Sequence, residues 1–418
     1  MKVLKAAQSW LLPARSCNRL SNDNWNARPA DRPDGRFLFY CRPACRPGEC
    51  RILIDHRGMD KMNVQELWET LHASPELSLQ EVHTLEILKS FIKNETDLEL
   101  HDEKNWIYAV HEEPGADKTI VIRAEIDAIP KPGGGVFHGC GHDGHTAMAA
   151  GTAAAIKGRK LGKNVIFLFQ PGEEIGAGAA YCMPLFDRYK IDMVLACHNL
   201  PGYELGSFIY TENTFACASE GLKMSFSGHQ AHAAYPEDGL NPAGCVARTI
   251  SELMGVAASL ENTRGRRLTI INAQVGNPDY GISPGFGSVS VTIRAENDEY
   301  LKVLEQDVLK IAEANAAQDG LGFTYDIKDP FHATVNDAGI AEILSVAGKS
   351  AACSWKHEEA PVVRWSEDFG LFSTKAKAFY WGLGSGINQP GLHTENYVFP
   401  KALLDKGIRI WMEMIRTA

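Results

Sequence analysis

The chain has 418 residues, too many for one compact core, so we expect two domains and some additional segments. Apolar residues make up 44% of it, as in a globular protein, and no run approaches the roughly 18 consecutive apolar residues of a membrane span. The formal net charge of −10 argues against nucleic acid as a general partner. Ten scattered cysteines favour a reducing, cytoplasmic location.

The first 61 residues differ in composition from the rest of the chain. Residues 1–61 carry 12 Lys and Arg against 6 Asp and Glu, the opposite of the bias of the whole chain. They are rich in Pro and Arg and have little apolar surface to bury, so we predict a disordered N-terminal extension. The alternatives are a targeting peptide, which the acidic residues disfavour, and a zinc site of uncommon spacing at Cys41, Cys45, Cys50 and His56.

The next part of the chain alternates between helix and strand patterns. Apolar residues in the range 82–92 recur on one face of a helix. Three apolar runs are typical of strands buried on both faces, namely 119–124, 164–170 and 191–197, and an alanine-rich helical run, 146–156, separates the first two. This alternation predicts an α/β fold with a mainly parallel sheet covered by helices.

The most informative motif lies between the first two of these strands. Residues 137–145 place one thiol, three imidazoles and one carboxylate in a glycine-rich turn. Because glycine has no Cβ and readily adopts positive φ, the side chains of such a turn can converge on one point. Cys140 and His142 could therefore bind the same ion, and a soft thiolate with an imidazole suits zinc or a neighbouring transition metal.

Two adjacent carboxylates follow the second strand. Pro171 and Gly172 end the apolar run and leave Glu173 and Glu174 at its carboxyl end, where open α/β sheets place their ligands. Adjacent side chains cannot point the same way. We therefore expect one of them to bind metal and the other to remain free for proton transfer.

Two histidines lie after later strand-like runs. His198 follows the third strand of the series, and His393 lies in a glycine-broken loop near the C-terminus. Read together with Cys140, His142 and Glu174, they give five donors, about what two divalent metal ions that share a bridging water need.

The pattern changes from about residue 215. Strands and helices are then predicted in the order βαββαβ, the ferredoxin-like arrangement, at 221–226, 241–260, 267–273, 288–294, 298–315 and 323–328. Asn241 is expected to cap the first of these helices, with Pro242 at its first position.

Residues after about 330 return to the alternation of the first part and bring His393 with them. We therefore predict a discontinuous catalytic metal-binding domain, made of 62–214 and 330–418. The residues between these segments, 215–329, would form an inserted lid or dimerisation domain.

From about residue 62 to its end, the chain resembles the M20 metallopeptidases. The resemblance is to the amidohydrolase branch of that family, which includes hydrolases of N-acyl amino acids, of hippurate and of indole-3-acetyl amino acids. It rests on seven blocks in the family's order, which are 71–78, 123–130, the Cys140 motif, the Glu173 and Glu174 pair, 228–236, 366–369 and His393.

The resemblance implies a role for each candidate residue. Glu173 would be the general base, and His232 of the inserted domain would be the lid histidine that contacts substrate and stabilises the oxyanion. Asp127 and Asp143 would orient ligand histidines. The metal ligands would be Cys140, His142, Glu174, His198 and His393. The family also implies a homodimer built through the lid.

Three departures from the family's pattern concern substrate selection and leave the metal ligands intact. Glu125 stands where the family usually has aspartate, and the loop at 131–135 is shorter than usual. Near Pro284, Gly281 replaces the usual asparagine.

The implied reaction is hydrolysis of the amide bond of an N-acyl or N-aroyl amino acid, or of a related small amide, by water that two divalent metal ions activate. Zinc, manganese, cobalt and nickel are all compatible with a donor set of Cys, His and Glu. A dipeptidase or aminopeptidase of the same scaffold is the main alternative and would need a site for a free α-amine. A non-catalytic protein that binds a small molecule or metal would lack the base or a ligand, and here none is missing.

Overall fold

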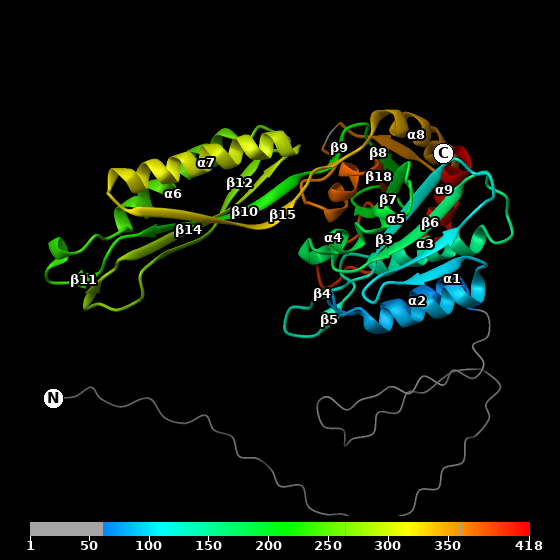
Figure 1. The fold of residues 1–418 in the computed structure, drawn as a ribbon, viewed down its shortest axis with the longest axis horizontal. Coiled ribbons are helices and arrows are strands. Elements are labelled where there is room, and N and C mark those ends of the chain that lie inside the picture. The colour runs from blue at the N-terminus through cyan, green and yellow to red at the C-terminus, as the bar shows by residue number, and fades with distance from the viewer. Residues whose placement is uncertain (1–61, 264, 360) are drawn as a thin grey trace, which may run out of the picture. The chain divides into compact units, whose positions relative to one another are not determined.

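The computed structural model describes residues 62–263, 265–359 and 361–418, so the extension predicted at 1–61 lies outside the described residues. Figure 1 shows how the elements are arranged. The α-helices of the described part are α1 (Val64–His72), α2 (Val82–Glu95), α3 (His142–Ala155), α4 (Gly178–Cys182), α5 (Leu185–Arg188), α6 (Ala243–Ser259), α7 (Asp298–Gln318), α8 (Ala338–Ala351) and α9 (Leu403–Thr417). Among the residues that the structure describes, none of the helices has the length and apolar character needed to span a bilayer.

The larger sheet has eight strands and mixed direction. Its order is β1 (Glu99–Asp102), β2 (Ile107–His111), β6 (Asn164–Gln170), β3 (Thr119–Glu125), β7 (Met193–Pro201), β18 (Lys377–Gly386), β8 (Phe208–Tyr210) and β17 (Trp355–His357). The predicted parallel direction is found in the central strands β6, β3, β7 and β18, whereas β1, β2 and β6 pair antiparallel, as do β18 and β8. A short connection such as that between β1 and β2 can join only antiparallel strands.

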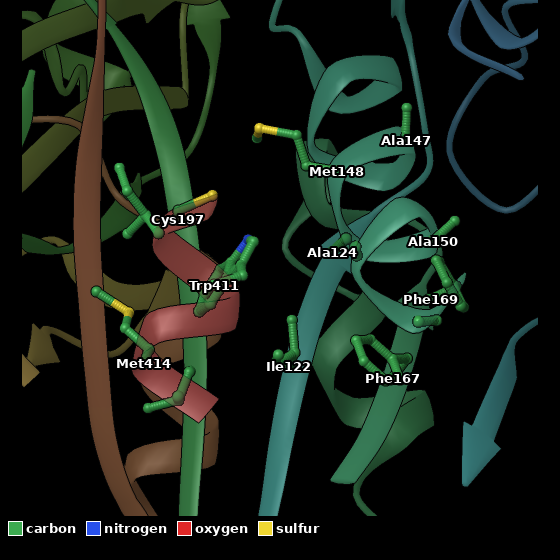
Figure 2. Close-up of a cluster of buried hydrophobic side chains, with 14 of the residues drawn as sticks. Ile122, Ala124, Ala147, Met148, Ala150, Phe167, Phe169, Cys197, Trp411 and Met414 are labelled. Carbon is green, nitrogen blue, oxygen red and sulfur yellow. The ribbon is translucent and has the colours of Figure 1, made fainter. Parts of the chain in front are cut away.

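Both faces of this sheet are buried, which explains why its central strands are apolar throughout. On β6, Phe167 and Phe169 belong to the core that α1, α2, α3, α8 and α9 cover, and Figure 2 shows them with residues of α3 and α9. The alternate residues Ile166 and Leu168 belong to the opposite core, with α4 and α5. The side chains of a strand alternate between its faces, so a strand covered on both sides needs apolar residues at every position.

Two element boundaries differ from the predictions and matter for the site. Helix α3 begins at His142, because Gly141 adopts a left-handed conformation (φ +96°) at its N-terminus. Strand β7 continues to Pro201 instead of ending at residue 197, so His198 lies within a strand. Pairing of β7 with the glycine-rich β18, for example His198 opposite Gly382, extends the strand past its apolar part.

The smaller sheet has four antiparallel strands in the order β12 (Arg267–Val275), β14 (Phe286–Ala295), β10 (Ala218–Ser227) and β15 (Gly322–Phe331). Its chain order is β10, α6, β12, β14, α7 and β15, and the two helices share one apolar core with the strands. Helix α6 begins at Ala243, one residue later than predicted, with Pro242 in the cap position. The side chain of Asn241 still accepts a hydrogen bond from the Ala243 backbone, at 2.9 Å.

Short strands complete the described elements. They form the pairs β4 (Ile129–Pro130) with β5 (Val136–Phe137), β9 (Thr214–Ala216) with β16 (Thr334–Val335), and β11 (Ala231–His232) with β13 (Ile282–Ser283). The 3-10 helices of the described part are η1 (Glu173–Ile175), η2 (Pro236–Asp238) and η3 (Asp368–Thr374). Strand β18 lies between β7 and β8, so the C-terminal part of the chain completes the larger sheet.

Candidate active site

The predicted donors converge near the carboxyl ends of the parallel strands. Gly141 makes this possible, because a Cβ at this position would lie 2.1 Å from the side-chain oxygen of Asn199. With positive φ and no Cβ, Gly141 turns the chain tightly between Cys140 and His142, so both side chains face the same space. His393 also has positive φ, and its backbone N–H donates to the Gly139 carbonyl at 2.8 Å, which fixes its loop against the turn.

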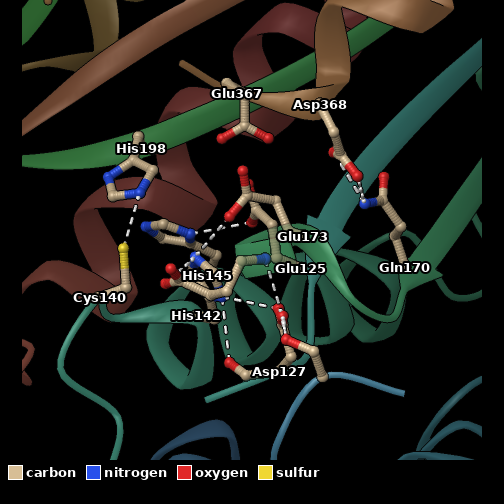
Figure 3. A network of polar contacts seen from close by, with 12 residues as sticks. Glu125, Asp127, Cys140, His142, His145, Gln170, Glu173, His198, Glu367 and Asp368 are labelled. Atoms are coloured by element: carbon tan, nitrogen blue, oxygen red, sulfur yellow. Dashed lines mark hydrogen bonds and ion pairs between the residues drawn. The ribbon is translucent and has the colours of Figure 1, made fainter. Parts of the chain in front are cut away.

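The five predicted donors form two overlapping groups that share one sulfur. Cys140 Sγ lies 3.4 Å from His198 Nε2 and 3.4 Å from His393 Nε2. The donors of Cys140, His142 and His198 lie within 4.8 Å of one another, and so do those of Cys140, Glu174 and His393. Figure 3 shows the first group beside the carboxylate of Glu173. The set therefore has enough donors for two ions.

Unpartnered buried atoms indicate that this space suits cations. His142 Nε2 and Glu174 Oε1 are buried and lie 3.8 Å apart, and neither has a hydrogen-bond partner among the described residues. Buried polar atoms normally have such a partner. Burial, with Glu174 and Glu173 nearby, also raises the pKa of the Cys140 thiol well above its usual range. A divalent cation would oppose that shift and accept all three atoms, so the residues fit a metal.

Glu173 lies beside the donors but differs from Glu174 in its surroundings. It begins η1 and is buried, and its carboxylate lies 3.8 Å from His142 Nε2. Burial, followed by the nearby carboxylates of Glu367 and Glu174, raises its pKa well above the usual range of a carboxyl group. A carboxyl group whose charged form is disfavoured holds a proton readily, which suits a group that must accept one and return it.

The two aspartates expected to orient ligand histidines lie in different places. Asp127 contacts His142 Nδ1 through its carboxylate and its carbonyl, each at 3.1 Å, and this leaves Nε2 facing the donors. Asp143 instead pairs with His72 Nδ1 at 2.6 Å. Adjacent residues of a helix point about 100° apart, so in the first turn of α3 His142 faces the site while Asp143 faces α1.

A cavity of about 280 Å³ opens onto the donors. Its walls include residues that the sequence reasoning gave no role, and three of them are large and apolar. The ring of Trp365 lies 4.8 Å from the ring of His198, centroid to centroid. The lining residues are Cys140, Glu173, Glu174, His198, Phe331, Trp365, Ser366, Glu367, Leu392 and His393.

A buried polar network underlies the cavity. Arg123 donates to Gln170 and to Asp368 at 2.8 and 2.7 Å and is paired with Glu125. Glu125 Oε2 contacts His145 Nδ1 at 3.0 Å. Figure 3 shows Glu125 near His142 and His145, and Asp368 beside Gln170. Charged residues inside an otherwise apolar strand such as β3 were the signal that could have predicted this network, because a buried charge needs partners.

His232, the predicted lid histidine, is not among the described residues that line the cavity. It is exposed and ends β11, which pairs with β13. Its Nδ1 accepts a hydrogen bond from the Ala234 backbone at 3.0 Å, so Nε2 is the ring nitrogen not used by this bond.

Comparison with known proteins identifies the scaffold. The family model described as Peptidase family M20/M25/M40 matches residues 121–417, a range that includes all five donors. The chain belongs to this family. As a member of the M20 family it is a metal-dependent hydrolase of amide bonds, with an α/β fold built on a large mixed sheet.

Relatives with assigned names cover most of the chain. The hippurate hydrolase of Campylobacter jejuni is 25% identical over 369 residues, 84% of this chain and 95% of its own length. The N-acetylcysteine deacetylase of Bacillus subtilis is 27% identical over 353 residues, 80% of this chain and 90% of its own length. A solved dinuclear metal-binding peptidase of the M20 family from Bacillus subtilis has a TM-score of 0.73 at 23% identity, covering 84% of this chain and 96% of that one.

Proposed function

We propose that this M20 hydrolase cleaves the amide bond of N-acyl or N-aroyl amino acids. The observation that carries the proposal is the cavity in which four of the five metal donors and the buried carboxyl of Glu173 meet three apolar side chains. The donors and the base supply the chemistry of hydrolysis, and the apolar walls supply a place for an acyl group. Relatives named hippurate hydrolase and N-acetylcysteine deacetylase support this substrate class.

The residues of the two donor groups would hold two divalent ions, of zinc, manganese, cobalt or nickel. When bound, such ions lower the pKa of water and polarise a carbonyl oxygen. Glu173 would accept the proton of the attacking water and donate it to the leaving nitrogen. Asp127 would keep the ring of His142 oriented, because the contact at Nδ1 leaves Nε2 for the metal.

The inserted domain has the role of a lid in this proposal. Residues 62–214 and 330–418 would form the catalytic domain, and 215–329 a ferredoxin-like lid that also builds a homodimer. The strand order β12, β14, β10, β15 with α6 and α7 supports the ferredoxin-like assignment. His232 is exposed on this part of the chain, as expected of a residue that reaches substrate only on closure.

The proposed cellular location is the cytoplasm. The described cysteines Cys140, Cys182, Cys197, Cys217, Cys245 and Cys353 are all free thiols, which is usual in a reducing compartment.

The main alternative, an aminopeptidase or dipeptidase, needs a free acidic group for the α-amine of its substrate. Glu367 is a cavity-lining carboxylate that is neither one of the five donors nor the proposed base, and its charge is already paired with a buried arginine. One lies 2.7 Å from an Arg123 nitrogen and the other accepts from the Tyr380 hydroxyl at 3.0 Å. The geometry therefore favours a substrate whose nitrogen is acylated.

The test is a panel of amides offered to metal-reconstituted protein, with the released amine as the readout. It contains N-benzoyl, N-acetyl and free-amine forms of the same amino acids. We expect hydrolysis of the N-acylated compounds, with N-benzoyl ahead of N-acetyl because of the aromatic walls. Preference for free dipeptides would favour the peptidase alternative. No hydrolysis of any compound would favour a non-catalytic binding protein.

Trp365 gives a sharper prediction about the acyl group. Trp365→Ala removes the aromatic wall beside His198, so the preference for N-benzoyl over N-acetyl substrates, measured as the ratio of kcat/KM values, should fall by about tenfold. Trp355→Ala is the matched control, because Trp355 is an exposed tryptophan of β17 that does not line the cavity. An unchanged ratio in Trp365→Ala would place the acyl group elsewhere.

A further inference from the structure

The segment between α1 and α2 touches the turn that carries the proposed general base. We call residues 76–81 the strap and residues 172–174 the base turn. The strap is fixed at its beginning, because Ala128 N donates to the Glu76 carbonyl at 2.8 Å. The carboxylate of Glu76 in turn accepts a hydrogen bond from the Thr84 backbone at 2.8 Å, in the first turn of α2. The strap is therefore a braced connection, although it is neither helix nor strand.

Each backbone N–H next to Glu173 donates to a buried carboxylate. Gly172 N donates to Glu81 Oε1 at 2.8 Å, and Glu174 N donates to Asp127 Oδ2 at 3.0 Å. Glu81 and Asp127 are 3% and 0% exposed, so water does not compete for these bonds. The base turn is thus held on both sides of Glu173, which sets the direction in which its side chain leaves the backbone.

Residues of the strap form or support both of these hydrogen bonds. Glu81 belongs to it, and Ser78 donates from Oγ to the same Asp127 oxygen that holds the base turn, at 2.7 Å. Leu79 packs against the turn itself, since a Cβ on Gly172 would lie 2.9 Å from Leu79 Cδ2. Leu79 also has φ +63°, a strained conformation for a leucine that persists only where the surroundings hold it.

We propose that the strap positions Glu173 for proton transfer and that Glu81 is its principal positioning residue. The proposal rests on the assignment of Glu173 as the general base. Without Glu81, the N–H of Gly172 would lose its acceptor and the base turn could move. Displacing a reacting group by about 1 Å can lower a rate by about 10²-fold. Glu174 lies in the same turn, but its own N–H remains bonded to Asp127 when Glu81 is lost. Across the described residues, no hydrogen bond or ion pair joins Glu81 to the five donors, so the loss of Glu81 should lower turnover and leave metal content unchanged.

The test compares Glu81→Leu with Glu81→Gln. Leucine removes the acceptor, so kcat should fall by about 10–10²-fold while KM and bound metal stay at the parental values. Glutamine keeps an acceptor oxygen and should restore kcat to within about threefold of the parent. Glu113→Leu is the matched control, because the Glu113 carboxylate also accepts backbone N–H groups, of Leu161 and Gly162 at 2.6 and 2.9 Å, in a loop outside the site. It should lower Tm and leave kcat unchanged.

A double variant separates positioning from general damage. In a Glu173→Gln background the base is already lost, so adding Glu81→Leu should lower kcat no further. If kcat of the double variant falls by the product of the two single-variant decreases, the proposal is overturned. A parental kcat in Glu81→Leu would also overturn it. If Glu81→Leu does not fold, Ser78→Ala replaces it in the test. In Ser78→Ala, a lower kcat with parental bound metal supports the proposal, and a parental kcat overturns it. Parental turnover in Glu173→Gln would instead contradict the proposed function itself.

Discussion

Substitutions of the neighbouring acids Glu173 and Glu174 should impair different properties of the enzyme, turnover in one case and metal binding in the other. Glu173 Oε2 and Glu174 Oε1 both lie 3.8 Å from His142 Nε2, but Glu174 also lies 3.4 Å from His393 and shares a donor group with it. Proximity to one histidine therefore does not separate the two roles. The second histidine does, because Glu174 lies within reach of two histidines of the donor set and Glu173 of only one.

Glu173→Gln keeps the size of the side chain and removes proton acceptance. We expect turnover to fall by about 10²–10⁴-fold while bound metal stays at the parental level. Glu174→Gln is the paired control and should lose metal, since an amide is a weaker ligand than a carboxylate. Metal analysis and turnover on one N-acyl substrate measure both outcomes. Near-parental turnover of Glu173→Gln would refute its role as base.

Cys140→Ser tests the sulfur that the two donor groups share. A serine hydroxyl is not readily deprotonated, so this variant should retain less metal after dialysis than the parent. Cys353→Ser is the control, because Cys353 is exposed and belongs to neither group. Equal retention by the parent and Cys140→Ser would mean that the thiol is only a packed part of the turn.

At the scale of elements, the start of a helix and the end of a strand decide which side chains meet. Helix α3 begins at His142, so its first turn directs His142 to the site and Asp143 to His72. Strand β7 extends beyond its apolar run and so includes His198, because β18 pairs with β7 as far as Pro201. The first effect arises from the adjacent Gly141, and the second from pairing with a strand that is distant in the chain.

Strand β10 carries a buried acid that makes stability depend on pH. Burial, with Glu305 nearby and only Lys302 opposing, raises the pKa of Glu220 to about 7. Between about pH 4.5 and 7 the native protein keeps a proton that the unfolded chain has released, so stability falls as pH rises. Glu220→Gln does not titrate, and its unfolding free energy relative to the parent should rise by about 1–2 kcal/mol from about pH 4.5 to 8, after allowing for solvent screening. Denaturant unfolding at both pH values measures this, and a constant difference would contradict it.

At the scale of the whole molecule, the donors tie together segments far apart in the chain. They come from the start of α3, the turn after β6, the end of β7 and the loop after β18. Ions bound there would cross-link these segments in the native state only. Removing them with a chelator should therefore lower Tm. Each bound ion would contribute about 3 kcal/mol to the free energy of unfolding at a metal concentration about 100 times Kd, and the chelator removes this contribution.

Differential scanning calorimetry with and without chelator measures this shift, and adding metal back should reverse it. The Cys140→Ser variant should show a smaller shift than the parent, because it has less metal to lose. Equal Tm values for the parent with and without chelator would mean that the donors do not cross-link the fold.

The amino-acid sequence alone determined the residue types of the site and most of its strands. Apolar runs predicted β3 and β6 closely, because a strand buried on both faces must be apolar at every position. The glycine-rich turn predicted Cys140 and His142 as donors and the acid pair predicted one carboxylate donor, which the family resemblance assigned to Glu174. These signals are local, so one sequence contains them.

Only the tertiary structure decided which distant residues meet. It paired Asp143 with His72, engaged Glu367 with Arg123, and brought Trp365 beside His198. Glu81 of the strap and Gly172 of the base turn lie 91 positions apart in the chain, and the sequence of neither segment predicts their contact. Periodicity and spacing describe a residue's neighbours along the chain, whereas these contacts depend on how strands order themselves in the sheet and on where each connection crosses it.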